Sequence, residues 1–472
     1  MDGATEVETF ADRQVIKLRS EVFRDVKPSV QVKGATIRVF AARVRTGSAA
    51  HGTVRQDNEF EYTTTVSPVY DAKRVVASRN GDELVITNMY VNGFKPLNFV
   101  TRTVVRAVGS TRCMSSVGRA QAALYTEPGD PSQVLRVAET KVSQPLATDV
   151  VVRMLAAPIN PSDLNQIEGT YPVKGVFTEI PCATQTLRAA VGGNEGVGEV
   201  VVVGSGVSGI GVGDWVVPRR SGQFGTWCTH TTVSGDSVDV IPEEWRRGVS
   251  GLTVASLKVN PCTAYRMLRD FCTLQPGDYV VQNGANSGVG RSVIQLAREI
   301  GVRTINVIRD RPQREFEQLS AELTALGADI VVSDKQVGEV KGSVNGPVRL
   351  GFNCVGGRAT LAMTKLISHG GTLVTYGGMS RQPVTLPTSL LLFKDIAARG
   401  FWMNRWYLDS ANAEEKQRMW RDILLMAGDG RFVAQPMQSV RWSPMMDIDD
   451  VQQRVRSAVA WDAGSKHAFV FD

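Results

Sequence analysis

The stretch Tyr279-Val-Val-Gln-Asn-Gly-Ala-Asn-Ser-Gly-Val-Gly290 decides the fold, because it joins a short apolar strand to a helix through a glycine-rich turn. Apolar residues recur at helical spacing after the turn, from Val293 to Ile300. Glycines in such a turn let the backbone approach a pyrophosphate, which binds the free N–H groups of the helix N-terminus. The spacing G-x-x-x-G-x-G departs from the usual dinucleotide fingerprint, so this motif alone leaves a nucleotide site and a plain turn equally open.

Strands and helices alternate around this turn. A helical stretch at 314–326 lies among strand-like runs at 279–282, 304–308, 330–332, 348–353 and 372–375. This βαβ pattern predicts an α/β fold with a doubly wound parallel sheet over residues 259–404.

Residues 120–258 have a different pattern of short valine-rich strands and turns. The strand-like runs are 122–125, 150–156, 197–203 and 214–218, and the third and fourth are joined by a glycine-dense turn. This pattern predicts a small β-rich, barrel-like domain. Residues 405–472 contain one helical stretch and a closing strand, and we expect them to complete that domain.

Composition excludes several classes of protein. With 472 residues, 43% of them hydrophobic, the chain can form two or more packed domains. No run of 18 uncharged apolar residues occurs, so we expect no transmembrane helix. The net charge is +6, and residues 1–118 alone carry +5, so the remainder is nearly neutral. The main body is therefore not a basic nucleic-acid-binding domain, and the interleaved aromatic and basic residues of a single-strand binder are missing.

Residues 89–119 have the composition of a mitochondrial transit peptide. They contain five basic residues and no acidic one, with Ser, Thr and Val between them. Because such peptides stand at the true N-terminus, our hypothesis is that Met89 is an alternative or authentic start and that residues 1–88 are an extension of unknown structure, absent from the mature protein. The other interpretation is an ordinary basic linker.

The end of the second strand indicates which dinucleotide binds. Arg309, Asp310 and Arg311 stand there, 19 residues after Gly290. In this fold that strand end meets the adenosine ribose, where a carboxylate suits a 2′-hydroxyl and arginines suit a 2′-phosphate. Two guanidinium groups beside one carboxylate favour NADPH over NADH, and a solvated charged turn is the alternative.

A catalytic zinc ion is not expected. Zinc-dependent alcohol dehydrogenases carry a histidine ligand where this chain has Asn194, in Gly192-Gly-Asn-Glu-Gly196. The chain has only four histidines, none in a Cys/His cluster, and no repeated C-x-x-C pair. We expect Glu195 to make a structural contact.

Without a metal ion, an enzyme that transfers hydride from NADPH needs another group to stabilise the negative charge that develops on its substrate. Tyr171 lies in a loop after Asn160-Pro-Ser-Asp163, and a phenol can protonate or hydrogen-bond an enolate. By its chemistry alone, however, a loop tyrosine is more often a packing or surface residue.

Together these pieces resemble mitochondrial trans-2-enoyl-thioester reductases of the medium-chain dehydrogenase/reductase superfamily. The resemblance covers roughly 350 residues from about Ala122 to the C-terminus. Nine motifs carry it in order, at 154–171, 191–197, 259–268, 274–278, 286–290, 303–312, 353–357, 370–379 and 393–402. It implies a Rossmann nucleotide domain (259–404) and a GroES-like catalytic domain (120–258 with 405–472).

The resemblance also implies roles for individual residues. Tyr171 would be the proton donor. Cofactor contacts would come from Asn260 on the nicotinamide side, a phosphate loop, a 2′-phosphate clamp, two strand-end segments and a C-terminal lysine. The phosphate loop would be Asn286, Ser287, Gly288 and Val289, and the 2′-phosphate clamp would be Arg309, Asp310 and Arg311. The two segments would be Tyr376, Gly377, Gly378 and Met379, and then Phe401, Trp402, Met403 and Asn404, of which the last two differ from the usual residues. The C-terminal lysine would be Lys466.

The family reduces enoyl groups on acyl carrier protein or coenzyme A in mitochondrial fatty acid synthesis, usually as a homodimer. The resemblance therefore implies NADPH-dependent enoyl thioester reduction in the mitochondrial matrix. Acyl carrier proteins are acidic, so a basic rim is expected, and Arg219, Arg220 and Arg405 are its candidates. The alternative is that these arginines are scattered solvated charges.

Two departures from the family pattern leave other functions open. Residues 172–190, between Tyr171 and Val191, are about twice as many as usual, and they include Cys182 and Arg188. Residues 1–88 have no recognised counterpart.

The first alternative function is an NADPH-dependent quinone or enone reductase, which would need no acyl channel. The second is a non-catalytic scaffold subunit of a mitochondrial assembly.

Overall fold

The computed structural model describes residues 120–460 and 466–472, apart from the side chain of residue 410, together with the backbone of eight strands within residues 5–106. The chain divides into two units, residues 1–118 and residues 119–472. No helix among the described residues is long and apolar enough to cross a membrane.

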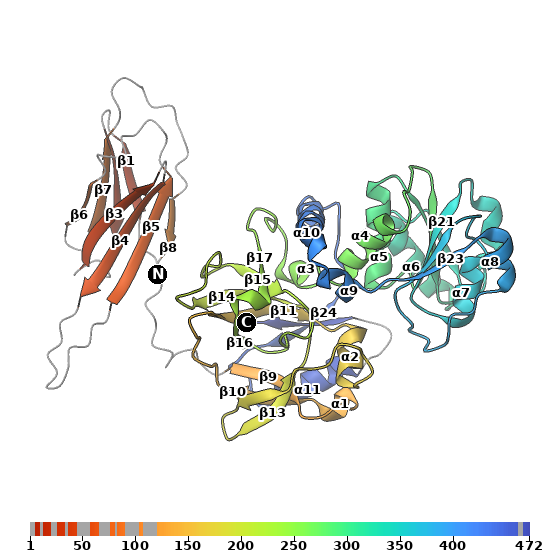
Figure 1. Cartoon of the computed structure of the whole chain (residues 1–472), viewed down its shortest axis with the longest axis horizontal. Coiled ribbons are helices and arrows are strands. Elements are labelled where there is room, and N and C mark those ends of the chain that lie inside the picture. The colour runs from red at the N-terminus through yellow and green to blue at the C-terminus, as the bar shows by residue number, and fades with distance from the viewer. Residues whose placement is uncertain are drawn as a thin grey trace. The chain divides into compact units, whose positions relative to one another are not determined.

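The first unit contains two antiparallel four-stranded sheets, ordered β1-β2-β7-β6 and β3-β4-β5-β8 (Figure 1). Their strands are β1 (Thr5–Thr9), β2 (Arg13–Arg19), β3 (Val26–Lys33), β4 (Thr36–Val44), β5 (Asp57–Thr65), β6 (Val76–Asn80), β7 (Glu83–Met89) and β8 (Thr103–Arg106). The expected targeting segment, 89–119, includes β8 and the last residue of β7, and the rest of it lies outside the described residues. Its assignment stays a prediction.

The second unit contains the predicted doubly wound sheet. Six parallel strands follow the order β20-β19-β18-β21-β22-β23, with β18 (Tyr279–Asn283) in the middle (Figure 1). The others are β19 (Arg303–Ile308), β20 (Ile330–Ser333), β21 (Val348–Asn353), β22 (Thr372–Thr375) and β23 (Ala397–Gly400). The order reverses between β18 and β21, and such a switch point places a ligand crevice at the carboxyl ends of the strands.

Helices cover both faces of this sheet. Val280 of β18 packs with α4 (Asn260–Asp270) and α5 (Gly288–Glu299), whereas its neighbour Val281 packs with α7 (Gly357–Thr364) on the other face. Successive side chains of a strand point to opposite faces, so a strand covered on both sides is apolar throughout. This is why 279–282 reads as a continuous apolar run.

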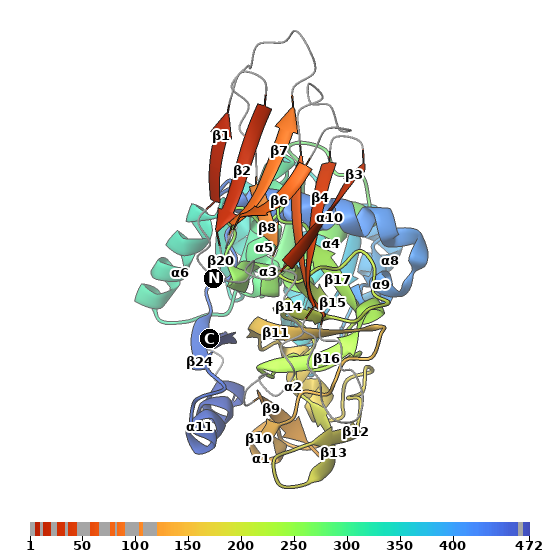
Figure 2. The same ribbon diagram turned by 90° about the vertical axis from the view of Figure 1, so that its left-hand side faces the viewer.

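The rest of the second unit is β-rich. A seven-stranded sheet has the order β17-β15-β14-β11-β25-β24, with β16 also paired to β11, and a four-stranded sheet has the order β10-β9-β13-β12. The strands are β9 (Ala120–Tyr125), β10 (Arg136–Thr140), β11 (Asp149–Pro158), β12 (Thr178–Pro181), β13 (Thr186–Val191), β14 (Val197–Val203), β15 (Trp215–Pro218), β16 (His230–Ser234), β17 (Val238–Ile241), β24 (Gln438–Trp442) and β25 (His467–Phe471). The C-terminal strands β24 and β25 therefore return to this sheet, as expected (Figure 2).

The other helices are short or connect these parts. They are α1 (Pro131–Val134), α2 (Pro161–Ile167), α3 (Gly251–Ala255), α6 (Gln313–Ala325), α8 (Thr388–Lys394), α9 (Met403–Leu408), α10 (Ala413–Gly428), α11 (Ile448–Val459), and the 3₁₀ turns η4 (Gly235–Ser237), η5 (Val337–Ser343) and η6 (Ser410–Asn412). The fold class is the predicted one, a doubly wound nucleotide-binding sheet with a β-rich GroES-like part. The exact domain boundaries stay predictions.

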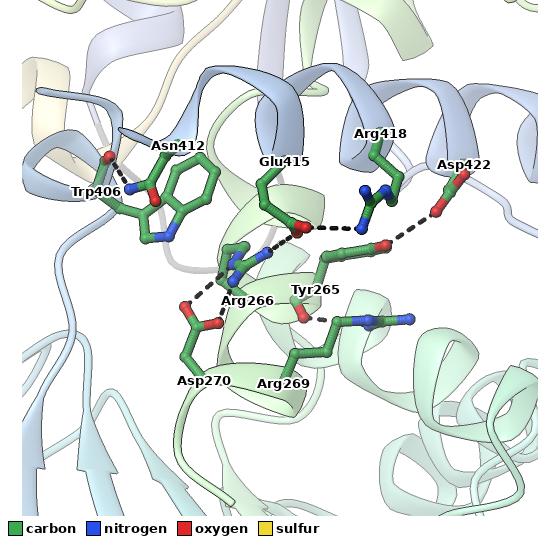
Figure 3. Close-up of polar contacts among 9 residues, drawn as sticks. All are labelled: Tyr265, Arg266, Arg269, Asp270, Trp406, Asn412, Glu415, Arg418 and Asp422. Atoms are coloured by element: carbon green, nitrogen blue, oxygen red, sulfur yellow. Dashed lines mark hydrogen bonds and ion pairs between the residues drawn. The ribbon is translucent and has the colours of Figure 1, made fainter. Parts of the chain in front are cut away.

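Charged side chains fix α10 to α4, as Figure 3 shows. Arg266 of α4 donates to Glu415 of α10 at 3.0 Å, and the Tyr265 hydroxyl donates to Asp422 at 2.9 Å. Arg418 also donates to Glu415, at 2.7 Å. These contacts hold in place the helix whose first residue is Asn260.

Candidate active site

One cavity of about 1220 Å³ collects the predicted site residues. Part of its wall comes from the carboxyl ends of the parallel strands, and part from the segment 160–171 and from Lys466. Asp310 is the only predicted site residue that does not line it. The lining residues are Tyr171, Asn260, Asn286, Ser287, Gly288, Val289, Arg309, Arg311, Tyr376, Gly377, Gly378, Met379, Phe401, Trp402, Met403, Asn404 and Lys466.

The turn after β18 forms a cradle at the start of α5. Ser287 caps this helix, its Oγ accepting a hydrogen bond from the N–H of Gly290 at 3.1 Å. A Cβ atom on Gly290 would lie 2.5 Å from the carbonyl oxygen of Ala285, so only glycine fits there without a shift. The first residues of α5, Gly288 and Val289, line the cavity, and the N–H groups in the first turn of a helix can bind phosphate.

Two arginines follow β19 at another part of the cavity. Arg309 and Arg311 line it, whereas the carboxylate of Asp310 pairs with Lys335 at 2.5 Å. The cradle and these guanidinium groups together fit a dinucleotide with a 2′-phosphate, since phosphate oxygens accept bidentate hydrogen bonds from arginine.

The Tyr171 hydroxyl is held by Trp402. Its oxygen accepts a hydrogen bond from Nε1 of Trp402 at 2.8 Å, and the two rings meet edge to face with centroids 6.1 Å apart. An indole N–H can only donate, so the phenol keeps its own proton for another acceptor. Burial raises the pKa of Tyr171, the hydrogen bond from Trp402 lowers it, and the nearby Asp163 carboxyl raises it. The net raised pKa keeps the phenol protonated at neutral pH.

A buried polar network lies beside Tyr171. The Asn160 side chain donates to Glu195 at 2.8 Å and accepts from Nζ of Lys466 at 2.8 Å. The other Glu195 oxygen accepts from the backbone N–H of Val259, also at 2.8 Å. Asp163 accepts from the backbone N–H of Asn160 at 2.8 Å, so the network joins residues that are up to 306 positions apart.

Burial dominates the protonation equilibria of this network. It raises the pKa of Asp163 to about 6, although a hydrogen bond from Asn194 opposes the shift. It also raises the pKa of Glu195 and lowers that of Lys466, while attraction between these two opposes both shifts. The ammonium group of Lys466 therefore compensates two buried carboxyl groups.

Asn194, which stands where zinc-dependent alcohol dehydrogenases have a histidine ligand, and its neighbours do not fit a zinc site. The Asn194 side chain donates to Asp163 at 2.9 Å and to Oε1 of Gln166 at 2.7 Å. Zinc sites in enzymes use histidine, cysteine and carboxylate ligands. Within 120–460 and 466–472, no three His, Cys, Asp or Glu side chains form a group that could hold a metal ion. Glu195 makes structural contacts, as expected.

The longer segment after Tyr171 folds as a hairpin. Its strands β12 and β13 pair with each other, and β13 continues the four-stranded sheet through β9. Cys182 is buried, and its backbone forms an isolated antiparallel β-bridge with Thr140 of β10. None of residues 172–190 is among those that line the cavity.

Sequence reasoning missed one wall of the cavity. Residues 433–438, which follow α10 and include the first residue of β24, line it together with Glu315, Gln318 and Glu322 of α6. The 433–438 segment has no glycine motif or charge pattern, so no local signal pointed to it.

Two family models match the second unit. Residues 146–251 match the alcohol dehydrogenase GroES-like domain, and residues 288–422 match the zinc-binding dehydrogenase domain. The fold and the site thus define a medium-chain dehydrogenase/reductase whose donor set at Asn194 does not suit zinc.

Individual relatives narrow the assignment. The mitochondrial enoyl-[acyl-carrier-protein] reductase of Xenopus tropicalis is 44% identical over 323 residues, covering 67% of this chain and 87% of the relative. A structure of Etr1p with NADP and crotonyl-CoA has a TM-score of 0.68 at 33% identity, covering 75% of this chain and 99% of that one. The Etr1p/Etr2p heterodimer of Candida tropicalis, a mitochondrial 2-enoyl thioester reductase, has a TM-score of 0.67 at 33% identity with the same coverage. This chain belongs to the mitochondrial enoyl-[acyl-carrier-protein] reductase family.

Proposed function

We propose that this chain reduces the carbon–carbon double bond of trans-2-enoyl thioesters with NADPH in the mitochondrion. The hydroxyl of Tyr171, held by Trp402 in the same cavity as the nucleotide cradle, is the observation that carries the proposal. Relatives that are named enoyl-[acyl-carrier-protein] reductases and a neighbour complexed with NADP and crotonyl-CoA support the substrate and the cofactor. The relatives are also named mitochondrial, and residues 89–119 have a transit-peptide composition.

The residues of the cavity have separate roles in proton transfer, cofactor binding and positioning. When bound, NADPH supplies the hydride that adds to the β-carbon of the substrate. Negative charge then develops on the α-carbon and the thioester oxygen, and Tyr171 transfers its proton to the α-carbon. The start of α5 and the two arginines would hold the phosphate groups of the cofactor, while Trp402 keeps the Tyr171 oxygen in place.

The direct test compares substrates. Purified chain should oxidise NADPH with trans-2-hexenoyl-CoA and should be slow with a simple quinone. Turnover of the quinone alone would support the quinone reductase alternative. Binding of NADPH without turnover of any enoyl thioester would support the scaffold alternative.

The choice of cofactor can be tested at Arg309 and Arg311. Replacing both with Ala removes two charge-assisted contacts to a 2′-phosphate, each worth about 1.5–3 kcal/mol. We expect the Kd for NADPH to rise by about 100-fold or more and the Kd for NADH to change little, as measured by fluorescence titration. Equal losses for the two dinucleotides would contradict the clamp.

We propose that acyl carrier protein is the partner that delivers the substrate, docking on a basic rim at Arg220 and Arg405. Both arginines are exposed, and each adjoins a cavity-lining residue in the sequence. Those two neighbours, Ser221 and Asn404, are hydrogen-bonded at 2.9 Å. Arg219, the third candidate, is committed to Asp239 at 3.1 Å.

Charge reversal tests this rim. We expect the Arg220→Glu and Arg405→Glu double variant to raise KM for an enoyl-acyl carrier protein by about tenfold at low salt, because rim charges govern encounter with an acidic partner. Turnover of the uncharged N-acetylcysteamine thioester should stay unchanged. Arg454→Glu, on the exposed side of α11, is the matched control. An equal effect in the control, or on both substrates, would count against the rim.

We also propose that the chain forms a homodimer through β23. This strand lies at the edge of the six-stranded sheet, and three of its four residues are exposed. Beside it, Leu392 and Phe393 of α8 are 68% and 78% exposed. An open strand edge with exposed apolar side chains favours pairing with a second copy.

The oligomeric state can be measured directly. Wild-type protein should sediment as a dimer in analytical ultracentrifugation, and the Leu392→Ser and Phe393→Ser double variant should sediment as a monomer. A variant that remains dimeric would place the interface elsewhere.

A further inference from the structure

Side chains of α5 fix the segment that follows α10. Gln295 of α5 accepts from the backbone N–H of Val433 at 2.7 Å and donates to the carbonyl oxygen of the same residue at 3.0 Å. Arg298 donates to the carbonyl oxygen of Arg431 at 2.9 Å, and the intervening Phe432 is buried. Residues 431–433 are therefore part of the nucleotide-binding framework, although they are more than 130 positions from α5 in the sequence.

This docking places the Gln435 side chain over the first turn of α5. A Cβ atom on Gly288 would lie 2.5 Å from Oε1 of Gln435 and 2.6 Å from Nδ2 of Asn260. Both amide groups thus lie close to Gly288, the first residue of α5, and all three residues line the cavity.

The Gln435 oxygen is buried and, among the described residues, has no hydrogen-bond partner. A buried acceptor left unsatisfied costs about 1–3 kcal/mol, so such a group in a binding cavity indicates a ligand that satisfies it. A phosphate cannot do so, because its oxygens accept hydrogen bonds at neutral pH. A hydroxyl or an N–H group is required.

The neighbours of Gln435 indicate which half of the cofactor supplies this donor. Asn260 directly follows Val259, whose N–H binds Glu195 in the network beside Tyr171. The 2′-phosphate end is instead marked by Arg309 and Arg311, after β19. Gln435 is therefore on the side of the reacting ring.

We propose that Gln435 is a further cofactor-binding residue, whose side-chain oxygen accepts a hydrogen bond from a ribose hydroxyl or the carboxamide N–H of the nicotinamide half of NADPH. This inference rests on the proposed NADPH-dependent function. It adds a specific acceptor, supplied by the 433–438 segment, to a site otherwise built from the glycine turn and strand ends.

Binding measurements on the full chain test the role of Gln435. Gln435→Leu should raise the Kd for NADPH by about three- to tenfold, the equivalent of one net hydrogen bond. The Kd for 2′,5′-ADP, which lacks the nicotinamide half, should not change. Gln133→Leu, an exposed change on α1, is the control for the substitution itself.

A stability measurement separates ligand binding from a structural role. Without cofactor, Gln435→Leu should have a Tm equal to or above that of the wild type, because it removes an unsatisfied buried acceptor. A lower Tm with unchanged Kd would overturn the proposal, as would an equal rise in the Kd values for NADPH and 2′,5′-ADP. Failure of the wild type to bind either NADPH or 2′,5′-ADP would instead refute the proposed function.

The reduced 3-acetylpyridine analogue of NADPH distinguishes the two donors, because its ring substituent has no N–H group. A carboxamide donor predicts that Gln435→Leu weakens NADPH binding but leaves binding of the analogue unchanged. A ribose hydroxyl predicts equal losses for both dinucleotides.

Discussion

Tyr171→Phe should lower kcat for a trans-2-enoyl thioester by about 100- to 10,000-fold, the range that a positioned general acid contributes. The substitution removes one oxygen and the proton that we assign to the α-carbon, and it leaves the aromatic ring against Trp402. The Kd for NADPH should change less than twofold, because the phosphate cradle and the arginines are untouched. Stopped-flow turnover together with fluorescence titration of NADPH would measure both quantities.

Trp402→Phe is the informative companion of this variant. It removes the N–H that holds the Tyr171 oxygen at 2.8 Å but keeps an aromatic ring and the phenol itself. A smaller loss in kcat than for Tyr171→Phe is expected, because the acid is present but less well placed. If Tyr171→Phe kept wild-type turnover with an enoyl thioester, another group would have to be the proton donor.

Lys466→Met should destabilise the second unit by about 3 kcal/mol, because it leaves two buried carboxyl groups without the nearby positive charge that compensates them. The ammonium group of Lys466 is bonded to Asn160 at 2.8 Å and compensates Glu195 and Asp163, all of them buried. Urea denaturation followed by tryptophan fluorescence, without cofactor, would give the change in the free energy of unfolding.

A second substitution and the pH dependence identify the cause of that loss. Adding Glu195→Gln to Lys466→Met should recover part of the stability, because it removes one of the two carboxylates that lost their counterion. The deficit of Lys466→Met should also shrink as the pH falls toward 6, since burial already raises the pKa of Asp163 to about 6 and protonation removes its charge. A deficit independent of pH and of Glu195 would indicate lost packing.

Much of the fold could be predicted because its signals are local. The strands at 197–203, 348–353 and 372–375 have the bounds expected from their apolar runs. The βαβ alternation between them predicted a parallel sheet, and the closing strand was expected to return to the β-rich part, as it does. Strand periodicity and glycine turns depend on neighbouring residues, which a single sequence displays directly.

The site was only partly predictable, because several of its contacts join distant residues. The bond between Asn160 and Lys466 spans 306 positions, and the clamp of Gln295 on Val433 spans 138. No spacing rule indicates such pairs. Asp310, in contrast, was predicted as a cofactor contact from a local motif. Its side chain pairs with Lys335 and does not line the cavity.

The Glu195 carboxylate bridges the two halves of the reaction centre, binding Asn160 on one side and the first turn before α4 on the other. The segment that carries Asn160 and the proposed proton donor Tyr171 is consequently tied by a buried carboxylate to the helix that carries Asn260, a proposed nicotinamide contact. Catalysis tolerates little misalignment, since an error of about 1 Å can cost two orders of magnitude in rate. Substitutions around Glu195 are therefore expected to change turnover, although the substituted residues do not touch substrate or cofactor.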